Sequence, residues 1–313
     1  MKKLKLIMFY LSAFVFLLEY PLFSTEGTTA ATFLKFSKSA REASLAGAYS
    51  SVGDDSSSIF SNPASIINVE KKEVSLGFTS YLEGSKLGLF SFVTNSNESR
   101  LGFAVSAFNI DDIEKRGTTD QSGIMPEVGT FSSNDMAVFI SYAKKNCLKE
   151  VIDNLNGGIN LKFIRSKIDS SSAYAIALDA GLLYDYSNNM KLSFVLSNLG
   201  TKMKFEDEGD NLPLSVKAGG YYKFGDNLKL TGEVEEFIND SKFYPSIGAE
   251  FFLKESFALR AGYRFGYDRD NLGNDVGLSL GFGIITKDVS FNYAYVPFGD
   301  LGDINKFDIS FKF

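Results

Sequence analysis

The sequence has no histidine, no tryptophan and only one cysteine, Cys147, among its 313 residues. Without histidine, the chain cannot build a Ser-His-Asp or Cys-His catalytic site, nor a His-ligated zinc site. A single cysteine cannot form an intramolecular disulfide or a cysteine-rich metal cluster. The formal net charge is −6, whereas a nucleic-acid-binding surface needs clustered Lys and Arg. We therefore expect a protein that is not an enzyme, that holds no metal or other cofactor, and that has no nucleic-acid partner.

Long apolar runs are also scarce, and the clearest one lies at the N-terminus. It extends from Leu6 to Leu18, is broken only by Ser12, follows a lysine-rich start and precedes small or polar residues at 24–25. This layout predicts a secretory signal peptide over residues 1–24, with an N-terminal membrane anchor as the alternative. The run is shorter than the roughly 20 residues that a membrane-spanning helix needs. A mature chain without such a helix can enter a membrane only as a closed β-barrel.

The remaining chain is dominated by alternation of apolar with polar or small residues. In the last eight residues, for example, Phe307, Ile309, Phe311 and Phe313 alternate with polar side chains. Successive side chains of a strand point to opposite faces, so this pattern predicts strands with one apolar face. Most segments have about the 9–11 residues that a tilted strand needs to cross a bilayer. We count about fourteen: 74–82, 86–94, 100–109, 135–144, 156–165, 173–186, 190–198, 213–223, 227–237, 244–253, 256–266, 275–285, 287–296 and 305–313.

Most connections between these segments alternate in length; two depart from the order, because 83–85 is short where a long one is due and 145–155 is long where a short one is due. Short ones, such as 187–189 and 225–226, take turns with longer ones, such as 110–134, 166–172 and 199–212. Outer-membrane barrels show this pattern because periplasmic turns are short and extracellular loops long, whereas a soluble β-sandwich predicts no such alternation. The sequence thus predicts an all-β, antiparallel transmembrane barrel of about 14 strands (residues 74–313), integral to the cell outer membrane and in contact with its lipid.

Residues 25–73 do not alternate. Ser37 or Ser39 can cap a short helix that begins at Ala40 and stops at Gly47. A segment of this size beside a wide barrel predicts an N-terminal hatch or plug inside it. A periplasmic extension outside the pore is the alternative.

Alternation also places charged side chains on the inner face of the predicted barrel, namely Asp179, Lys217, Arg260 and Arg264. A charge on the lipid face at mid-membrane costs about 2–4 kcal/mol, so the lumen is the expected place for them. Two interpretations stay open. The side chains form a salt-bridge network that holds the plug, or Arg260 or Arg264 binds the carboxylate of a ligand.

Two motifs resemble one known family. The first consists of Arg41, Glu42, Gly47, Tyr49, Asp54, Asp55, Asn62 and Pro63, and the second of the run 293–302 followed by Phe307–Phe313. Both are similar to the PorV/PorQ-like proteins, which belong to the FadL-type group of outer-membrane barrels. The resemblance implies a fourteen-stranded barrel with an N-terminal hatch. It also implies that terminal Phe313, with Phe307, Ile309 and Phe311 of the same segment, forms a signal for the barrel-assembly machinery.

The resemblance leaves two functions open. A FadL-type barrel implies passive uptake of a hydrophobic small molecule, with movement of the hatch opening a route. A PorV-like protein implies a component of type IX secretion that binds exported proteins for surface attachment, through extracellular loops such as 110–134 and 199–212. We favour uptake, because it needs no other component.

Overall fold

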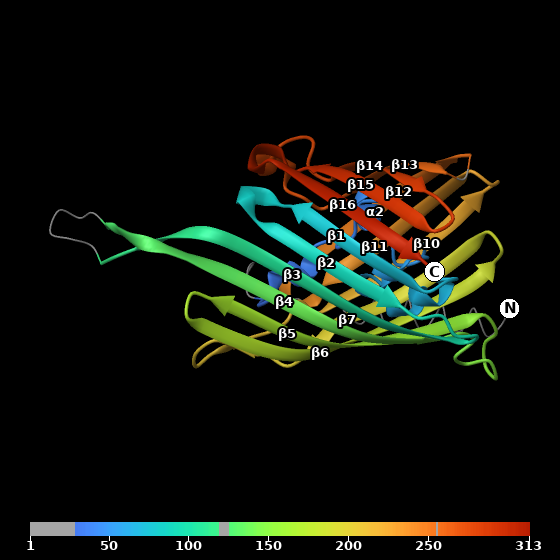
Figure 1. Ribbon diagram of the computed structural model, residues 1–313, viewed down its shortest axis with the longest axis horizontal. Helices are drawn as coiled ribbons and strands as arrows, with labels where there is room; N and C mark the ends of the chain where they lie inside the picture. The colour runs from blue at the N-terminus through green and yellow to red at the C-terminus, as the bar shows by residue number, and fades with distance from the viewer. Residues whose placement is uncertain (1–28, 119–124, 255) are drawn as a thin grey trace.

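The computed structural model describes residues 29–118, 125–254 and 256–313. Over these ranges, fourteen antiparallel strands form a closed barrel (Figure 1). A separate two-stranded hairpin is formed by β8 (Met203–Lys204) and β9 (Gly209–Asp210). The barrel strands are β1 (Glu73–Ser80), β2 (Lys86–Val93), β3 (Ser99–Arg116), β4 (Glu127–Lys144), β5 (Leu155–Ile168), β6 (Ser171–Ser187), β7 (Met190–Gly200), β10 (Ser215–Phe224), β11 (Leu228–Phe237), β12 (Lys242–Leu253), β13 (Phe257–Arg264), β14 (Leu278–Ile285), β15 (Val289–Pro297) and β16 (Asp303–Lys312).

In the described part of the chain, the helical elements are all short. Four of them precede the barrel: η1 (Thr32–Lys35), α2 (Ala40–Ser44), η2 (Ser56–Phe60) and η3 (Pro63–Asn68). Four lie in connections between strands: η4 (Leu82–Gly84), η5 (Ile238–Asp240), α3 (Arg269–Leu272) and η6 (Gly299–Leu301). Within the described ranges, no helix has the length and apolar character needed to span a membrane.

The barrel closes through β1, which pairs with β2 on one side and with β16 on the other. Val74 of β1 lies opposite Phe92 of β2 and opposite Phe311 of β16. A closed sheet has no free edge, so backbone N–H and C=O groups are satisfied without water. The predicted all-β fold and the count of fourteen strands are confirmed.

The two faces of the wall differ as the alternation predicts. On β1, the side chains of Leu76 and Phe78 are each 48% exposed on the outside, whereas Ser75 and Thr79 are buried inside. The same alternation recurs on β6, where Ile176 and Leu178 are exposed and Asp179 is buried. A wall that is apolar outside and polar inside is that of an integral outer-membrane protein.

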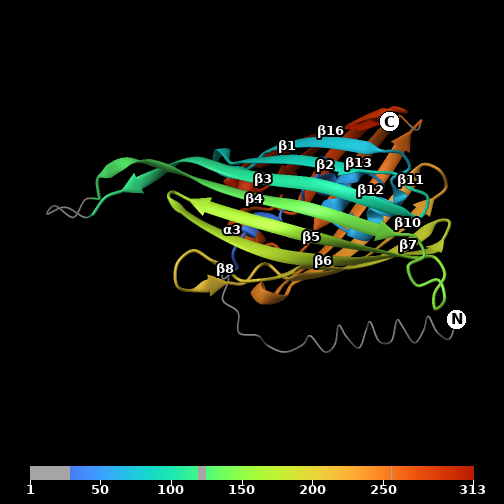
Figure 2. The ribbon, with the colours of Figure 1, turned by 60° about the horizontal axis from the view of Figure 1, so that its bottom comes forward.

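Two predicted connections are wrong. Residues 110–134 were expected as a loop, but residues 110–116 continue β3 and residues 127–134 belong to β4, and these two stretches pair and project beyond the rest of the barrel (Figures 1 and 2). A bulge between Ile110 and Ile113 interrupts the period of two, and the projecting strands have no apolar face to bury, so the pattern gave no strand signal. Residues 166–172 contain only a tight turn, because β5 ends at Ile168 and β6 begins at Ser171.

Residues 29–72, which we call the lumenal segment, lie inside the barrel (Figure 1). Contacts are made by α2 to β13–β16, by η2 to β1–β3 and by η3 to β3–β6. Nearly all residues from 38 to 66 are buried. The expected signal peptide, residues 1–24, lies outside the described residues.

An apolar core joins the lumenal segment to one half of the wall. Phe33, Ile59 and Ile66 pack with side chains of β2–β6, including Phe139 and Ile164. The core lies on the side of β2–β6, and the two lumenal cavities described below lie towards β11–β16.

Candidate functional site in the barrel lumen

The lumenal segment is held in shape by side chains that cap its short helices. Ser39 accepts a hydrogen bond from the backbone N–H of Glu42 at 3.1 Å and caps α2, one of the two caps that the sequence predicts. Asp55 caps η2 through the N–H of Ser57, and Asn62 caps η3 with Pro63 at its first position. A cap of this kind satisfies a backbone donor that the helix leaves free. Three of the motif residues therefore fix local backbone structure.

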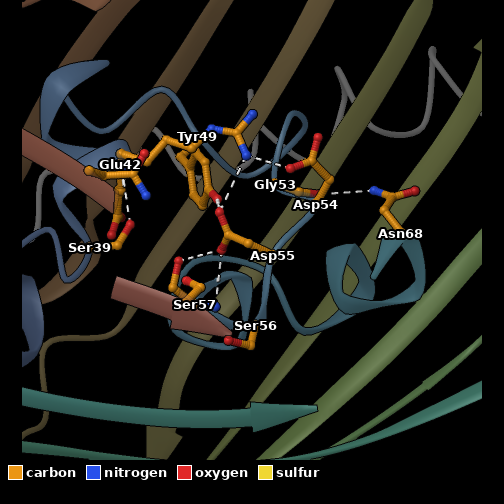
Figure 3. Close-up of polar contacts among 12 residues, drawn as sticks. Ser39, Glu42, Tyr49, Gly53, Asp54, Asp55, Ser56, Ser57 and Asn68 are labelled. Carbon is orange, nitrogen blue, oxygen red and sulfur yellow. Dashed lines mark hydrogen bonds and ion pairs between the residues drawn. The ribbon is translucent and has the colours of Figure 1, made fainter. Parts of the chain in front are cut away.

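A second group of motif residues forms a charged cluster around Arg41. Its Nε and Nη2 donate to the two carboxylate oxygens of Glu250 on β12, both at 2.9 Å. Its Nη1 donates to Asp54 and, at 3.3 Å, to Asp55. The hydroxyl of Tyr49 also donates to Asp55 (Figure 3). The cluster thus ties two parts of the lumenal segment to each other and to the wall.

The charges of this cluster shift the pKa values of its members. Burial acts to raise the pKa of Asp54, but the charges of Arg41 and Lys229 outweigh it and hold that pKa well below its usual range. Burial and the neighbouring Asp55 carboxylate raise the pKa of Tyr49 well above its usual value. At neutral pH, Asp54 therefore stays ionised and Tyr49 stays a donor.

Further contacts reach other strands. Ser50 pairs with Ser193 of β7 at 2.7 Å, and its backbone N–H donates to Glu233 of β11 at 2.9 Å. On the opposite side, Lys306 of β16 donates to the carbonyl of Ser37 at 2.7 Å. The lumenal segment is therefore hydrogen-bonded to strands on several sides of the barrel.

Glycines of the wall let the lumenal segment approach closely. A Cβ atom at Gly158 of β5 would lie 2.4 Å from the backbone N of Ala64, and one at Gly262 of β13 would lie 2.5 Å from the backbone C of Leu45. Side chains are excluded at both positions because backbone atoms occupy the space. Gly47 has a different role: its φ of +87° suits only a residue without Cβ in the turn after α2.

The four inward charges predicted from alternation are all in the lumen, but in three places. Arg260 donates to Glu250 at 2.7 Å and so joins the cluster around Arg41. Arg264 and Lys217 share Glu235, at 2.8 Å and 3.4 Å. Asp179 lies apart, where it pairs with Lys162 and accepts from the amide of Asn160.

Sequence reasoning missed the acidic partners, above all Glu250, Glu235 and Glu233. The signal was present, because Glu250 falls on the same face as Ser246 and Gly248, the buried face of β12. The pairing itself joins residues 209 positions apart, in the case of Arg41 and Glu250, and no local pattern encodes it.

A cavity of about 330 Å³ lies in the lumen on the side of β11–β16. It is at the end that carries the longer connections, which are extracellular in outer-membrane barrels. We call it the extracellular cavity. Ala43, Ala46 and Gly47 of the lumenal segment lie along it. Six aromatic side chains line it: Phe36, Tyr81, Phe237, Tyr244, Tyr267 and Phe298.

A second cavity, of about 350 Å³, lies towards the short turns at the opposite end. Short turns are periplasmic in outer-membrane barrels, so we call it the periplasmic cavity. Its lining is highly charged and includes Arg41, Asp54, Lys229, Arg260 and Lys312. Ala43 lines one cavity and Arg41, two residues earlier, lines the other. The stretch formed by α2 and the chain to Asp55, which we call the partition, therefore separates the two cavities.

The expected assembly residues lie at the outer face of the last strand. Phe307, Phe311 and Phe313 are 40–64% exposed, and Ile309 is half-buried. Apolar side chains here face the hydrocarbon. Their role in recognition by the assembly machinery stays a prediction.

Comparison with known proteins finds a family profile that matches part of the chain and solved structures that share the fold of most of the chain. The profile of the uncharacterised protein family UPF0164 matches residues 24–163. No curated protein sequence matches. The chain is similar to a mutant of the monoaromatic hydrocarbon channel TodX (TM-score 0.63, 12% identity, covering 88% of this chain and 99% of that one). It is also similar to a FadL homologue of Pseudomonas aeruginosa (TM-score 0.60, 12% identity, covering 88% of this chain and 98% of that one). A third similar structure is the Ralstonia pickettii toluene transporter TbuX (TM-score 0.59, 13% identity, covering 86% of this chain and 97% of that one).

The closed fourteen-strand wall and these likenesses define the class: an outer-membrane barrel with a FadL-like fold. At 12–13% sequence identity, these similarities show a shared fold but do not show which ligand this chain binds. The narrower resemblance to PorV/PorQ-like proteins is not confirmed.

Proposed function

We propose that the protein is a passive outer-membrane channel for hydrophobic small molecules, with residues 25–73 acting as a hatch in the barrel of residues 74–313. The observation that carries this proposal is the pair of cavities on opposite sides of the partition. A lumen with a binding space at each end and one removable obstacle between them suits stepwise passage. It needs no chemical step and no energy source.

The extracellular cavity supplies the binding step. Its aromatic lining removes apolar surface from water, which is favourable by roughly 25 cal/mol per Å². The molecule then crosses when the partition moves aside, and it reaches the periplasmic cavity. The charged lining there does not hold an apolar molecule, so release towards the periplasm follows.

The similar structures support this function by analogy. TodX and TbuX are named as a monoaromatic hydrocarbon channel and a toluene transporter. None of the three similar structures described above is named as a secretion component, and we do not carry the type IX role forward.

Deletion of residues 30–66 tests the hatch. If the segment blocks the lumen, the variant shows higher conductance in planar bilayers than the full chain. Deletion of residues 148–153, an exposed stretch of the connection between β4 and β5, is the matched control and leaves conductance unchanged. Equal conductance of the full chain and the 30–66 deletion would contradict a blocking role.

Purification from native envelope tests the transported class. The proposal expects apolar small molecules to co-purify with the barrel and to be detected by mass spectrometry after extraction. Exported surface proteins in place of such molecules would favour the secretion role. Uptake of a labelled apolar compound by whole cells that express the protein, compared with cells that do not, completes the test.

A further inference from the structure

The aromatic side chains of the extracellular cavity form two contacting groups. Phe36 stacks on Tyr81, with ring centroids 4.5 Å apart. Across the cavity lining, Tyr244 and Tyr267 have centroids 5.5 Å apart, and Tyr267 and Phe298 5.4 Å. Rings in offset or edge-to-face contact gain stability beyond their apolar burial, and a planar ligand ring can join such a set. The lining therefore favours a flat aromatic body over a flexible chain.

The same lining carries positive charge. Four cationic side chains line the cavity, namely Lys35, Lys242, Arg264 and Lys306. Asp240 is the one carboxylate among the described lining residues, so the formal charge of the lining is +3. This is opposite in sign to the net charge of −6 of the whole chain. A concave site whose charge is opposite to that of the molecule concentrates ligands of the complementary sign. An anionic group on the ligand is therefore expected.

Arg264 is the cation best placed to meet that group. Its guanidinium lies over the ring of Tyr244, 4.6 Å from the centroid, and its Nη2 donates to Glu235 at 2.8 Å. Glu235 is also paired with Lys217, so two cations share this one carboxylate, and a positive charge remains beside the cavity. The buried Nε of Arg264 has no hydrogen-bond partner among the described residues. Because Nε is closed off from the cavity, a ligand carboxylate meets Arg264 through the 14% of its side chain that is exposed, where it lines the cavity.

The size of the cavity bounds the ligand. Its volume of about 330 Å³ lies at the lower end of the range for small-molecule sites, about 300–1,000 Å³. The floor formed by Ala46 and Gly47 ends the space inside the lumen. One or two fused rings with a short anionic group fit these limits.

We infer that the extracellular cavity binds small aromatic acids, with the ring among the aromatic side chains and the carboxylate on Arg264. The inference rests on the proposed function and names the substrate class of the same site. It separates an aromatic anion from the two other classes of hydrophobic ligand, a neutral hydrocarbon and an alkyl acid.

Binding to the full chain in detergent micelles, measured by isothermal titration calorimetry, tests the inference with three probes. The probes are 2-naphthoate, 2-naphthylmethanol, which keeps the rings but has no charge, and octanoate, which keeps the carboxylate but has no ring. We expect 2-naphthoate to bind about tenfold more tightly than either other probe, the ratio that one charge-assisted contact or one ring contact supplies. Equal affinity for 2-naphthylmethanol, equal affinity for octanoate, or no binding of 2-naphthoate would overturn the inference.

Two variants locate the binding. Arg264→Gln should weaken 2-naphthoate about tenfold and leave 2-naphthylmethanol unchanged, because only the charged contact is lost. Tyr267→Leu should weaken both aromatic probes and leave octanoate unchanged. Lys115→Gln, in the projecting hairpin and exposed, is the matched control for loss of one cation. If Arg264→Gln does not fold, Tyr267→Leu and the three-probe comparison on the unmodified chain still decide.

The outcomes separate this inference from the proposed function. If cells take up a neutral aromatic compound through the barrel and 2-naphthoate does not bind, the channel stands and the acid class falls. If 2-naphthoate binds but no compound enters cells, the cavity is a binding site and the channel proposal fails.

Discussion

Arg41 and Glu250 form a two-pronged ion pair between the lumenal segment and the wall, with both N–O distances at 2.9 Å. Glu250 is fully buried, and the side chain of Arg41 is only 9% exposed. The two parallel hydrogen bonds between a guanidinium and a carboxylate are strong, and they fix the relative orientation of the two groups. The pair therefore fixes where the partition lies across the lumen, and it joins the predicted hatch motif to a residue that the motif does not contain.

Arg41→Gln should release the partition. The change removes the charge and leaves Glu250 buried, with Arg260 and, more distantly, Lys229 as its remaining cationic partners among the described residues. Breaking a buried pair from one side costs about 3–5 kcal/mol. We expect faster amide hydrogen exchange over residues 40–55 and more frequent opening in single-channel recordings.

The control for that change is Lys71→Gln. Lys71 pairs with Asp288 at 2.9 Å, but both side chains are largely exposed, and such a pair contributes about 0–1 kcal/mol. Exchange over residues 40–55 should not change. Equal effects of the two variants would mean that the Arg41 pair does not hold the partition.

Gly158→Val should prevent the lumenal segment from docking. The new Cβ would meet the backbone of Pro63 and Ala64 at 2.4 Å, and backbone atoms cannot move aside as a flexible side chain can. The β-branched residue is well suited to a strand, so the wall itself should form normally. We expect an assembled barrel with raised conductance in planar bilayers.

Gly232→Val on β11 serves as the comparison. A Cβ there has its nearest neighbour at 4.0 Å, so the strand gains the same side chain without a clash. Conductance should equal that of the unmodified chain. If Gly158→Val also leaves conductance unchanged, close approach at β5 is not needed for docking.

The wall could be predicted from the sequence because its physics is local. Each strand must turn one face to hydrocarbon, so apolar residues recur every second position, as in Phe307, Ile309 and Phe311. All fourteen predicted segments correspond to barrel strands. The projecting part of β3 and β4 was missed because its residues are exposed or only half-buried, and a bulge between Ile110 and Ile113 breaks the period of two.

The lumen was harder to predict because its contacts join distant parts of the chain. Arg41 and Arg260 were both singled out, but their common partner Glu250 was not. The aromatic lining of the extracellular cavity was also missed, since Tyr81, Phe237, Tyr267 and Phe298 come from the ends of different strands and from connections. Only closure of the barrel brings them together.

Phe313→Ala should lower the amount of assembled protein without changing the folded barrel. Phe313 is 64% exposed, and its backbone N–H donates to the carbonyl of Lys72 at 2.9 Å, a bond that alanine keeps. A lower amount of assembled Phe313→Ala barrel would therefore reflect weaker recognition during assembly. The measurement is the fraction of heat-modifiable barrel in the membrane, with Phe224→Ala, which is 51% exposed, as the control. Similar losses in both variants would argue against a terminal signal.

Docking of the lumenal segment should strengthen as the pH rises above 7, because of Lys38. Its ammonium is buried and donates to the carbonyl of Phe33. Burial, and next the charge of Lys306, lower the Lys38 pKa to about 7, and Glu42 opposes this only in part, while Lys162 and Lys217 add smaller repulsions. When the segment leaves its site, the Lys38 pKa returns to about 10.4.

Between these two pKa values, the undocked state binds more protons than the docked state, so docking gains up to roughly 1.4 kcal/mol per pH unit from this group. Below pH 7, Lys38 is protonated in both states and contributes no slope. Single-channel recordings from pH 6 to 9.5 should therefore show openings that become rarer only above pH 7. Lys38→Met, which cannot titrate, should lose this dependence. If the variant keeps the same slope, another group is responsible and Lys38 does not control docking.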